Sequence, residues 1–129
     1  MRHRLTRKAD ADIADILRTT NKLFGTDQVL AYAGIIGEGI AIIEADPSRP
    51  ACRPRGELGA GVKSMHLEHG LARRGSASHL IFFLEQATPS GEGEIVIVGV
   101  LHERMLPRRH LAQLLRDENA PGTASGSRS

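Results

Sequence analysis

The chain has 129 residues and a mass of 13.9 kDa, a length that favours a single domain. Its aromatic content of 3% is too low for a protein that binds single-stranded nucleic acid by stacking bases on several aromatic side chains. The single cysteine, Cys52, excludes an internal disulfide framework and a zinc site built from several cysteines. No apolar run reaches the ~20 residues of a membrane span, and no apolar segment follows the basic N-terminus as in a signal peptide. We therefore expect a cytoplasmic protein that does not enter a membrane.

The net charge is only +2, but charge is unevenly distributed along the chain. Residues 2–8 and 49–74 carry +4 each and residues 102–116 carry +3, whereas residues 9–48 carry −5. Arginine supplies 14 of the 17 basic residues, and its guanidinium group suits bidentate contacts with carboxylate or phosphate. If the basic blocks meet in the fold, they form a surface for an anionic partner. The alternative is a solvated face with local ion pairs.

The first half of the chain predicts a short strand followed by two helices. Residues 2–6 favour the strand, and from Ala9 apolar residues recur at helical spacing until Gly25, a residue typical of a helix C-terminus. Thr26 is expected to cap a second helix over about residues 27–44. The connection at Gly25 is too short for anything but a turn, so the two helices should form an antiparallel hairpin.

The second helix carries one apolar stripe and three unfavourable glycines. The stripe consists of Val29, Ala33, Ile36, Ile40 and Ile43, and the glycines are Gly34, Gly37 and Gly39. Each glycine costs a helix roughly 0.5–1 kcal/mol, whereas burying each aliphatic side chain contributes roughly 1.5–3 kcal/mol. We therefore expect a helix that depends on packing, with Ile40 and Ile43 buried against a sheet.

The second half of the chain predicts three strands. They cover residues 62–67, 79–84 and 95–101, and the last of them is β-branched and almost wholly apolar, as expected for a central strand. Residues 85–94 contain one proline and two glycines and favour a hairpin turn. The connection after the second helix is rich in proline and arginine.

A short final helix is expected over about residues 108–116, and residues 117–129 are small, polar and expected to be disordered. The element order is then β-α-α-β-β-β-α within one domain of residues 1–116. This order predicts an α+β fold, an antiparallel sheet with the N-terminal helical hairpin packed on one face.

No known catalytic or nucleotide-binding signature occurs in the sequence. His66 and His69 have the spacing of two metal ligands, but no third ligand is near them in sequence, so we expect neither a metal nor a cofactor. Cys52 lies in an arginine-rich loop without an evident base, and an inert thiol is the expectation.

A set of basic residues surrounds the predicted sheet, and it has two possible uses. It could hold an anionic partner by charge-assisted hydrogen bonds, or it could cleave RNA with a histidine or glutamate as acid and base. The only tyrosine, Tyr32, is expected to lie away from this set. The alternative is that the histidines are half-buried sheet residues and the arginines pair with nearby glutamates. The set comprises Arg49, Arg53, Arg55, Lys63, His66, Arg73, Arg74, His79, His102, Arg104, Arg108 and Arg109.

In order and spacing, five segments resemble the ParE toxins of the RelE/ParE superfamily, which belong to type II toxin–antitoxin systems. HRLTRKADADIADI at 3–16 resembles the opening strand and acidic first helix of that family. RPRGELGAGVKSMHL at 53–67 resembles its Arg-Pro, Glu-Leu and basic-Ser segment. SHLIFFLE at 78–85, IVIVGVLHERM at 95–105 and RRHL at 108–111 resemble its last two strands and the residues after them.

The resemblance implies a compact α+β toxin that inhibits growth. ParE-type members are implied to poison DNA gyrase without chemistry of their own, and a cognate ParD-like antitoxin neutralises them. One alternative is a RelE-like interferase that cuts mRNA on the ribosome, so that nucleic acid is contacted directly only in that case. A second alternative is a small basic nucleic-acid-binding domain.

Two groups of residues follow from the resemblance and the charge pattern. The residues expected to contact the target are Arg55, Glu57, Lys63, His102, Arg104 and Arg109, with Glu57 orienting an arginine. In a nuclease, His102, Arg104 and Glu57 would carry the chemistry. The residues expected to contact the antitoxin are Arg73, Arg74, Ile36 and Ile40. If the last strand stays extended, His102 and Arg104 should point to the same face.

Overall fold

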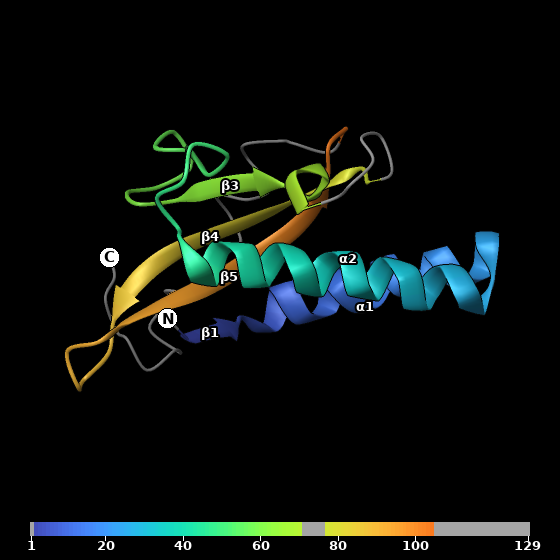
Figure 1. Ribbon diagram of the computed structural model, residues 1–129, viewed down its shortest axis with the longest axis horizontal. Helices are drawn as coiled ribbons and strands as arrows, with labels where there is room; N and C mark the ends of the chain where they lie inside the picture. The colour runs from blue at the N-terminus through green and yellow to red at the C-terminus, as the bar shows by residue number, and fades with distance from the viewer. Residues whose placement is uncertain (1, 71–76, 105–129) are drawn as a thin grey trace.

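A computed structural model describes residues 2–70 and 77–104 (Figure 1). The elements in chain order are β1 (Arg2–Leu5), α1 (Arg7–Phe24), α2 (Thr26–Ala45), β2 (Arg53–Pro54), β3 (Lys63–His66), the 3₁₀ turn η1 (Leu67–Gly70), β4 (His79–Ala87) and β5 (Gly93–His102). This is the predicted α+β arrangement, with the short strand β2 and η1 added. The predicted final helix and the tail from 117 onward lie outside the described residues.

The five strands form one sheet in the order β1-β5-β4-β3-β2. The sheet is mixed, which corrects the prediction of an antiparallel sheet: β1 runs parallel to β5, from Arg2 opposite Glu94 to Leu5 opposite Ile97, and the remaining pairs are antiparallel. A strand of four residues carries no local signal of direction. Its direction depends on where the chain must leave the sheet to begin α1.

The hairpin between β4 and β5 is tighter than the sequence indicated. The strands extend to Ala87 and start again at Gly93, which leaves a loop of residues 88–92. The backbone of Thr88 exchanges hydrogen bonds with Glu92 and Gly91, and Gly91 adopts a φ of 90°, in the region that favours glycine. The long hairpin places the chain's two central strands, β4 and β5, side by side.

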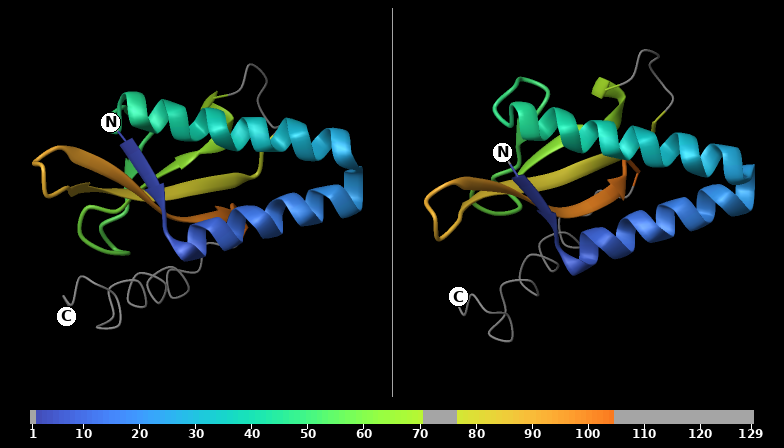
Figure 2. Two further views of the ribbon diagram at one scale, coloured as in Figure 1. Left: turned by 90° about the horizontal axis from the view of Figure 1, so that it is seen from below. Right: turned by 60° about the horizontal axis from the view of Figure 1, so that its bottom comes forward.

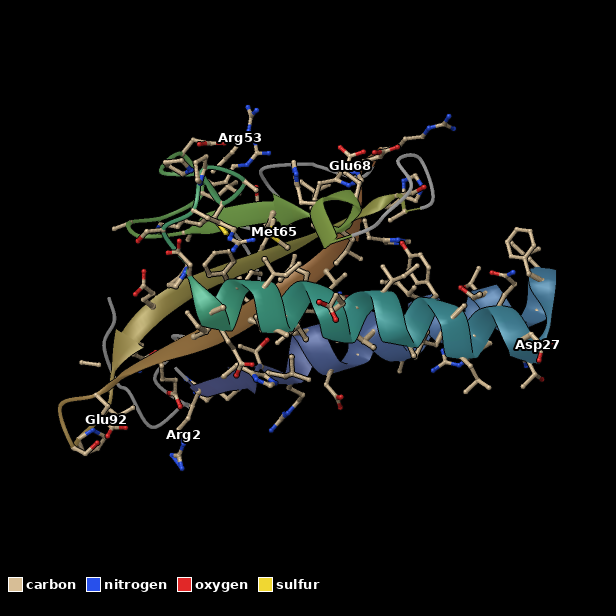
Figure 3. The ribbon with its side chains drawn as sticks, viewed as in Figure 1. Arg2, Asp27, Arg53, Met65, Glu68 and Glu92 are labelled. Carbon is tan, nitrogen blue, oxygen red and sulfur yellow. The ribbon has the colours of Figure 1, made fainter. Side chains whose placement is uncertain are left out.

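Helices α1 and α2 lie antiparallel across one face of the sheet, as predicted, and extend beyond its end (Figures 1 and 2). The strand ends below this overhang are the C-termini of β3 and β5 and the N-terminus of β4. Figure 3 places Asp27 at the tip of the hairpin and Met65 between β3 and α2. The arrangement therefore leaves the connection at Gly25 projecting away from the sheet.

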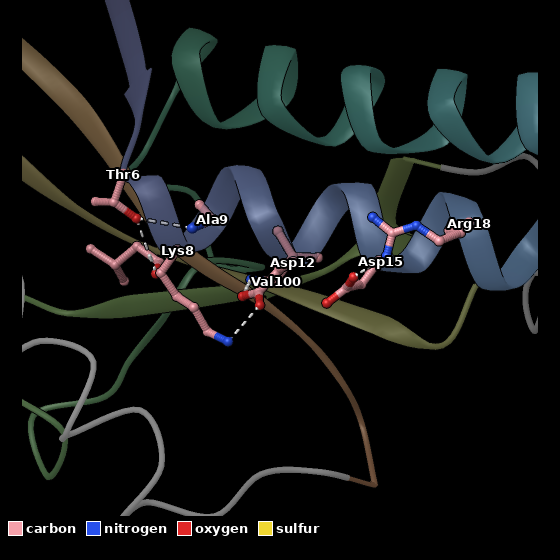
Figure 4. A network of polar contacts seen from close by, with 8 residues as sticks. Thr6, Lys8, Ala9, Asp12, Asp15, Arg18 and Val100 are labelled. Atoms are coloured by element: carbon pink, nitrogen blue, oxygen red, sulfur yellow. Dashed lines mark hydrogen bonds and ion pairs between the residues drawn. The ribbon is translucent and has the colours of Figure 1, made fainter.

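The start of α1 is fixed to β5 by side chains that serve the backbone (Figure 4). The Thr6 hydroxyl accepts a hydrogen bond from Ala9 N as a helix cap and donates to the carbonyl oxygen of Val98. Asp12, which is buried, accepts a hydrogen bond from Val100 N and pairs with Lys8. Strand β1 pairs with β5 only as far as Ile97. Beyond that residue, Thr6 and Asp12 supply hydrogen-bond partners to the backbone of β5 along the edge that β1 does not cover.

Helix α2 packs on the sheet through the second half of its stripe. Ile36, Ile40 and Ile43 are buried, which confirms the prediction for Ile40 and Ile43. Ala33 is exposed, because the first turns of α2 lie on the overhang. Thr26 is the first helical residue rather than the cap, and Gly25 holds the cap position without a side-chain hydrogen bond.

Among the described helices, α2 is the one long and apolar enough to cross a membrane by length and composition alone. This helix is not one uninterrupted apolar run, because Asp27, Glu38 and Glu44 lie within it. A core helix of a soluble protein passes the same test. Ile36, Ile40 and Ile43 of α2 lie in the core against the sheet, while 22% of its most apolar stretch is buried.

Strand β5 is central, as predicted, and contributes to apolar clusters on both faces of the sheet. Ile95, Ile97 and Val100 face the helices, whereas Val96, Val98 and Leu101 face the other side. Ile97 and Val100 share a face, despite being three residues apart, because the register between β4 and β5 shifts at this point. The shift also determines which face His102 occupies at the end of the strand.

Candidate functional site

A row of three aromatic side chains lies at the end of the sheet, where the hairpin of helices α1 and α2 extends beyond the strands. The Oη atom of Tyr32, on α2, is 2.6 Å from Nδ1 of His79, at the start of β4. His79 is the register partner of His102, at the end of β5, and their rings meet edge to face with centroids 5.2 Å apart. We call Tyr32, His79 and His102 the histidine row.

The position of Tyr32 corrects the expectation that it lies away from the basic set. Tyr32 is one helical turn before Ile36, which places it on the edge of α2 that faces the sheet. Its hydroxyl oxygen also accepts a hydrogen bond from Ser78 N, the residue before β4. The helical spacing of positions 32, 36, 40 and 43 was the sequence signal that places Tyr32 on the sheet side of α2. No local pattern indicated that Tyr32 would contact a histidine 47 residues further along the chain.

The hydrogen bonds in the row favour one tautomer for each histidine ring. Tyr32 Oη already accepts from Ser78 N, so its hydroxyl is placed to donate to His79 Nδ1. The backbone N–H of Arg104 donates to His102 Nδ1. In the neutral form of each ring, Nδ1 is therefore an acceptor and Nε2 bears the hydrogen.

Burial keeps His79 and Tyr32 uncharged near neutral pH. Burial, together with the nearby His102 and His66, lowers the pKa of His79 to about 4, and Glu103 opposes these effects. Burial also raises the pKa of Tyr32 above its ordinary value, against the hydrogen bond from Ser78. A neutral His79 and a protonated Tyr32 hydroxyl fit the hydrogen bond that joins them.

A second histidine contact lies on the opposite face of the same sheet end. His66 Nε2, on β3, is 2.8 Å from a carboxylate oxygen of Glu103, and its Nδ1 accepts from Glu68 N. The hydrogen bond from His66 lowers the pKa of the Glu103 carboxyl. His66 is therefore half-buried, as the alternative expected, but it pairs with Glu103 itself, whereas the alternative paired the nearby glutamates with arginines.

Arg104 does not continue the strand, so the condition for its alignment with His102 is not met. Strand β5 ends at His102, and Glu103 and Arg104 form a turn that the hydrogen bond from Arg104 N to His102 closes. The Arg104 side chain is exposed, and no described carboxylate lies within ion-pair distance of it. His102 and Arg104 are thus neighbours held by the backbone rather than two side chains on one strand face.

The other predicted target residues form a separate cluster. Arg55 donates to the Ser64 hydroxyl at 2.8 Å and lies 3.9 Å from Glu57, so Glu57 does accompany an arginine. Lys63 donates to the carbonyl oxygen of Pro47 and pairs with Glu85. Lys63 lies opposite Phe83, four residues along β4 from His79, which corresponds to about 13 Å.

The residues expected to contact the target therefore lie in two separate places. Two groups exist, one at the overhang with His102 and Arg104, and one beside β3 with Arg55, Glu57 and Lys63. The two apolar residues assigned to the antitoxin, Ile36 and Ile40, are buried in the core and offer it no exposed surface. Arg73, Arg74 and Arg109 lie outside the described residues.

Cys52 is buried beneath the loop after α2. Burial raises the pKa of its thiol, and the opposing effects of Lys63 and Arg49 are smaller. A thiol with a raised pKa is a poor nucleophile at neutral pH. This agrees with the expectation of an inert cysteine.

A cleft of about 470 Å³ opens between the overhanging helices and the end of the sheet. Its lining includes the whole histidine row, together with Ile16, Leu23 and Phe24 of α1. Leu23 and Phe24 are 65% and 69% exposed, unusual values for large apolar side chains. Sequence analysis missed this cleft because no local pattern shows that a helical hairpin is longer than the sheet beneath it.

Comparison with known proteins finds relatives that cover most of the chain. The chain is 32% identical to Toxin ParE of Escherichia coli over 112 residues, which cover 87% of this chain and 94% of that protein. It is 29% identical to Toxin ParE1 of Caulobacter vibrioides over 109 residues, covering 84% and 96%. A chain of the chromosomal ParDE TA system from P. aeruginosa has the same fold, with a TM-score of 0.60, 24% identity and coverage of 79% and 95%. No protein-family model matches the sequence.

The fold and these relatives define the toxin component of a type II toxin–antitoxin system. Identity above 30% across nearly the full length of a ParE toxin is decisive. The chain belongs to the ParE family of toxins. The resemblance seen in the sequence is thereby confirmed, and within the described residues the segments that carried it follow the order of the strands and helices given above.

Proposed function

We propose that this ParE-family toxin inhibits growth in the cytoplasm by acting on DNA gyrase, without catalysing a reaction, and that a ParD-like antitoxin neutralises it. Kinship with ParE toxins supports the toxin role. The matched structure is of a ParDE system, which supports an antitoxin of the ParD type. Gyrase is the target implied by the resemblance to ParE-type members.

One observation carries the preference for inhibition over RNA cleavage: the residues that a nuclease would need are not assembled. Glu57 lies with Arg55 beside β3, whereas His102 and Arg104 lie at the overhang. A general base also needs a free nitrogen lone pair. In His66, His79 and His102, the Nδ1 lone pair already has a hydrogen-bond donor, which leaves N–H at Nε2 in the neutral ring.

Charge constrains where an acidic antitoxin segment would bind. Helix α2 contains Asp27, Glu38 and Glu44 and no basic residue, so its exposed face would repel such a segment. The edge of the sheet at β2 carries the exposed Arg53, with Arg55 and Lys63 next to it. We therefore place the acidic part of the antitoxin at the β2–β3 edge, and only an apolar part on the helices.

Two cell-free assays test the target. The purified toxin is added to gyrase with relaxed plasmid and, separately, to a translation reaction with a defined mRNA. Our proposal expects supercoiling to be lost or cleaved plasmid to accumulate, and the mRNA to remain intact. Cleavage of ribosome-bound mRNA with unaffected gyrase would favour the RelE-like alternative, and plasmid binding without either effect would favour a nucleic-acid-binding domain. Added cognate antitoxin is the control, because it should abolish the effect on gyrase.

A further inference from the structure

The cleft under the hairpin has the size and composition of a small-molecule site. Its volume of about 470 Å³ lies within the usual range of roughly 300–1,000 Å³ for such sites. Ile16, Leu23 and Phe24 provide an apolar wall, and the side chains of His79 and His102 provide polar groups at the sheet end. An apolar wall with a few convergent polar groups is the common design of a ligand pocket.

At the sheet end of this cleft, the polar groups that remain available are the hydrogen-bond donors of the two histidines, while Thr19, Thr20, Gln28 and Ser78 also line the cleft. Tyr32 Oη is occupied, since it accepts from Ser78 and donates to His79. The Nε2–H groups of His79 and His102 have no acceptor among the described residues. One carboxylate, that of Asp15, also lines the cleft, and it is paired with Arg18.

We propose that the cleft binds a small carboxylic acid with an aromatic or aliphatic body. The carboxylate accepts hydrogen bonds from the Nε2–H groups of His79 and His102, and the body lies against Ile16, Leu23 and Phe24. A carboxylate fits two adjacent donors, because each of its oxygens can accept one bond. An amine of the same shape finds no free acceptor at the histidines. This binding does not depend on what the toxin acts on.

The experiment uses the purified chain and two matched probes, 3-phenylpropionate and 3-phenylpropylamine. Histidine side-chain ¹⁵N–¹H spectra are recorded during each titration at neutral pH. We expect 3-phenylpropionate to shift the signals of His79 and His102 in a saturable manner, and to leave His66 unaffected because it lies on the other face of the sheet. The amine is expected to bind at least about tenfold more weakly, the factor that loss of one charge-assisted hydrogen bond produces.

Two variants separate the hydrogen bonds from general apolar binding. His102→Phe keeps a flat ring but removes the N–H donor, and we expect it to weaken binding of the acid by about tenfold. His66→Phe is the control, since it changes a histidine at the same sheet end outside the cleft, and it should leave the affinity unchanged. Equal binding of both probes by the unmodified chain, or shifts that exclude His79 and His102, would overturn the proposal. Because these two results need no variant, the test stands even if His102→Phe does not fold.

Discussion

Tyr32 and His79, 47 residues apart in the chain, are joined by a hydrogen bond of 2.6 Å that links the helical hairpin to the first residue of β4. The same hydroxyl accepts from Ser78 N, so one side chain satisfies two groups at the start of the strand. Tyr32 is thus the polar end of the stripe that continues through Ile36 and Ile40 into the core. Two consequences can be measured, one for stability and one for its pH dependence.

Tyr32→Phe should destabilise the protein although it keeps the ring. The substitution leaves His79 Nδ1 without its donor and Ser78 N without its acceptor, and an unpaired partly buried polar group costs about 1–3 kcal/mol. Urea denaturation followed by circular dichroism measures the loss as a lower midpoint with an unchanged slope. An unchanged midpoint would show that water replaces the hydroxyl without cost.

The depressed pKa of His79 should make the protein less stable in mild acid. Its pKa is about 4 in the folded chain against 6.5 ordinarily, so between these values the unfolded state binds more protons. The free energy of unfolding should therefore fall as the pH is lowered from 6.5 towards 4. The lowered pKa of Glu103 acts in the same direction, but only below its ordinary value of 4.5.

Denaturation midpoints at several pH values between 4.5 and 6.5 check this window. His79→Gln is expected to flatten the pH dependence there, even if the variant is less stable overall. His3→Gln is the matched control, because His3 is an exposed histidine that pairs with Glu44 far from the row. If the denaturation midpoint changes with pH equally in both variants and in the unmodified chain, groups other than His79 cause the pH dependence.

The glycines of α2 show both the reach and the limit of sequence reasoning. The pattern located the hairpin, its turn at Gly25 and the buried Ile40 and Ile43, because the spacing of apolar residues reports which face of a helix is covered. It treated Gly34, Gly37 and Gly39 alike, as costs. Only the packing distinguishes them: a Cβ on Gly39 would lie 2.6 Å from a Leu67 side-chain carbon, whereas Gly37 has open space.

What the sequence could not supply were the relations between distant segments. The parallel pairing of β1 with β5, the meeting of Tyr32 with His79, and the separation of Glu57 from His102 all depend on how the elements are assembled. The alternation of side chains between the two faces of a strand also could not place Arg104, because it applies only within the strand and β5 ends at His102. Arg104 lies in a turn, so its side chain does not follow the alternation that places His102.

Gly39→Ala and Gly37→Ala form a matched pair with opposite expected signs. Gly37→Ala should stabilise the chain by about 0.5–1 kcal/mol, since alanine favours the helix and meets nothing. Gly39→Ala forces α2 away from Leu67, which is fully buried and has little room to move, and overpacking typically costs about 1–3 kcal/mol. Thermal unfolding compares the two. A rise in melting temperature for both would mean that Leu67 adapts.

Asp12→Ala should destabilise the connection between α1 and β5. It removes the acceptor for Val100 N at a buried position beyond the end of β1, and an unsatisfied buried donor costs about 1–3 kcal/mol. Asp12→Asn retains one acceptor oxygen and should cost less. Hydrogen exchange at the Val100 amide provides the specific readout: faster exchange in Asp12→Ala than in Asp12→Asn is expected. Equal exchange in the two variants would contradict a role for this hydrogen bond.

Arg104→Ala tests the residue that we expect to meet the target. Its guanidinium is exposed beside the cleft end of the sheet, no described carboxylate pairs with it, and the bond from its backbone to His102 holds the turn without the side chain. The variant should therefore fold and bind antitoxin normally while growth inhibition and the effect on gyrase fall sharply. Arg2→Ala is the matched control, an exposed arginine at the opposite end of the sheet, opposite Glu94, and it should remain toxic. Growth after induction, the gyrase assay and antitoxin binding are measured for both. Full toxicity of Arg104→Ala would show that Arg104 does not contact the target. A separate variant, His102→Gln, tests the nuclease alternative, because loss of mRNA cleavage in that variant would indicate a nuclease.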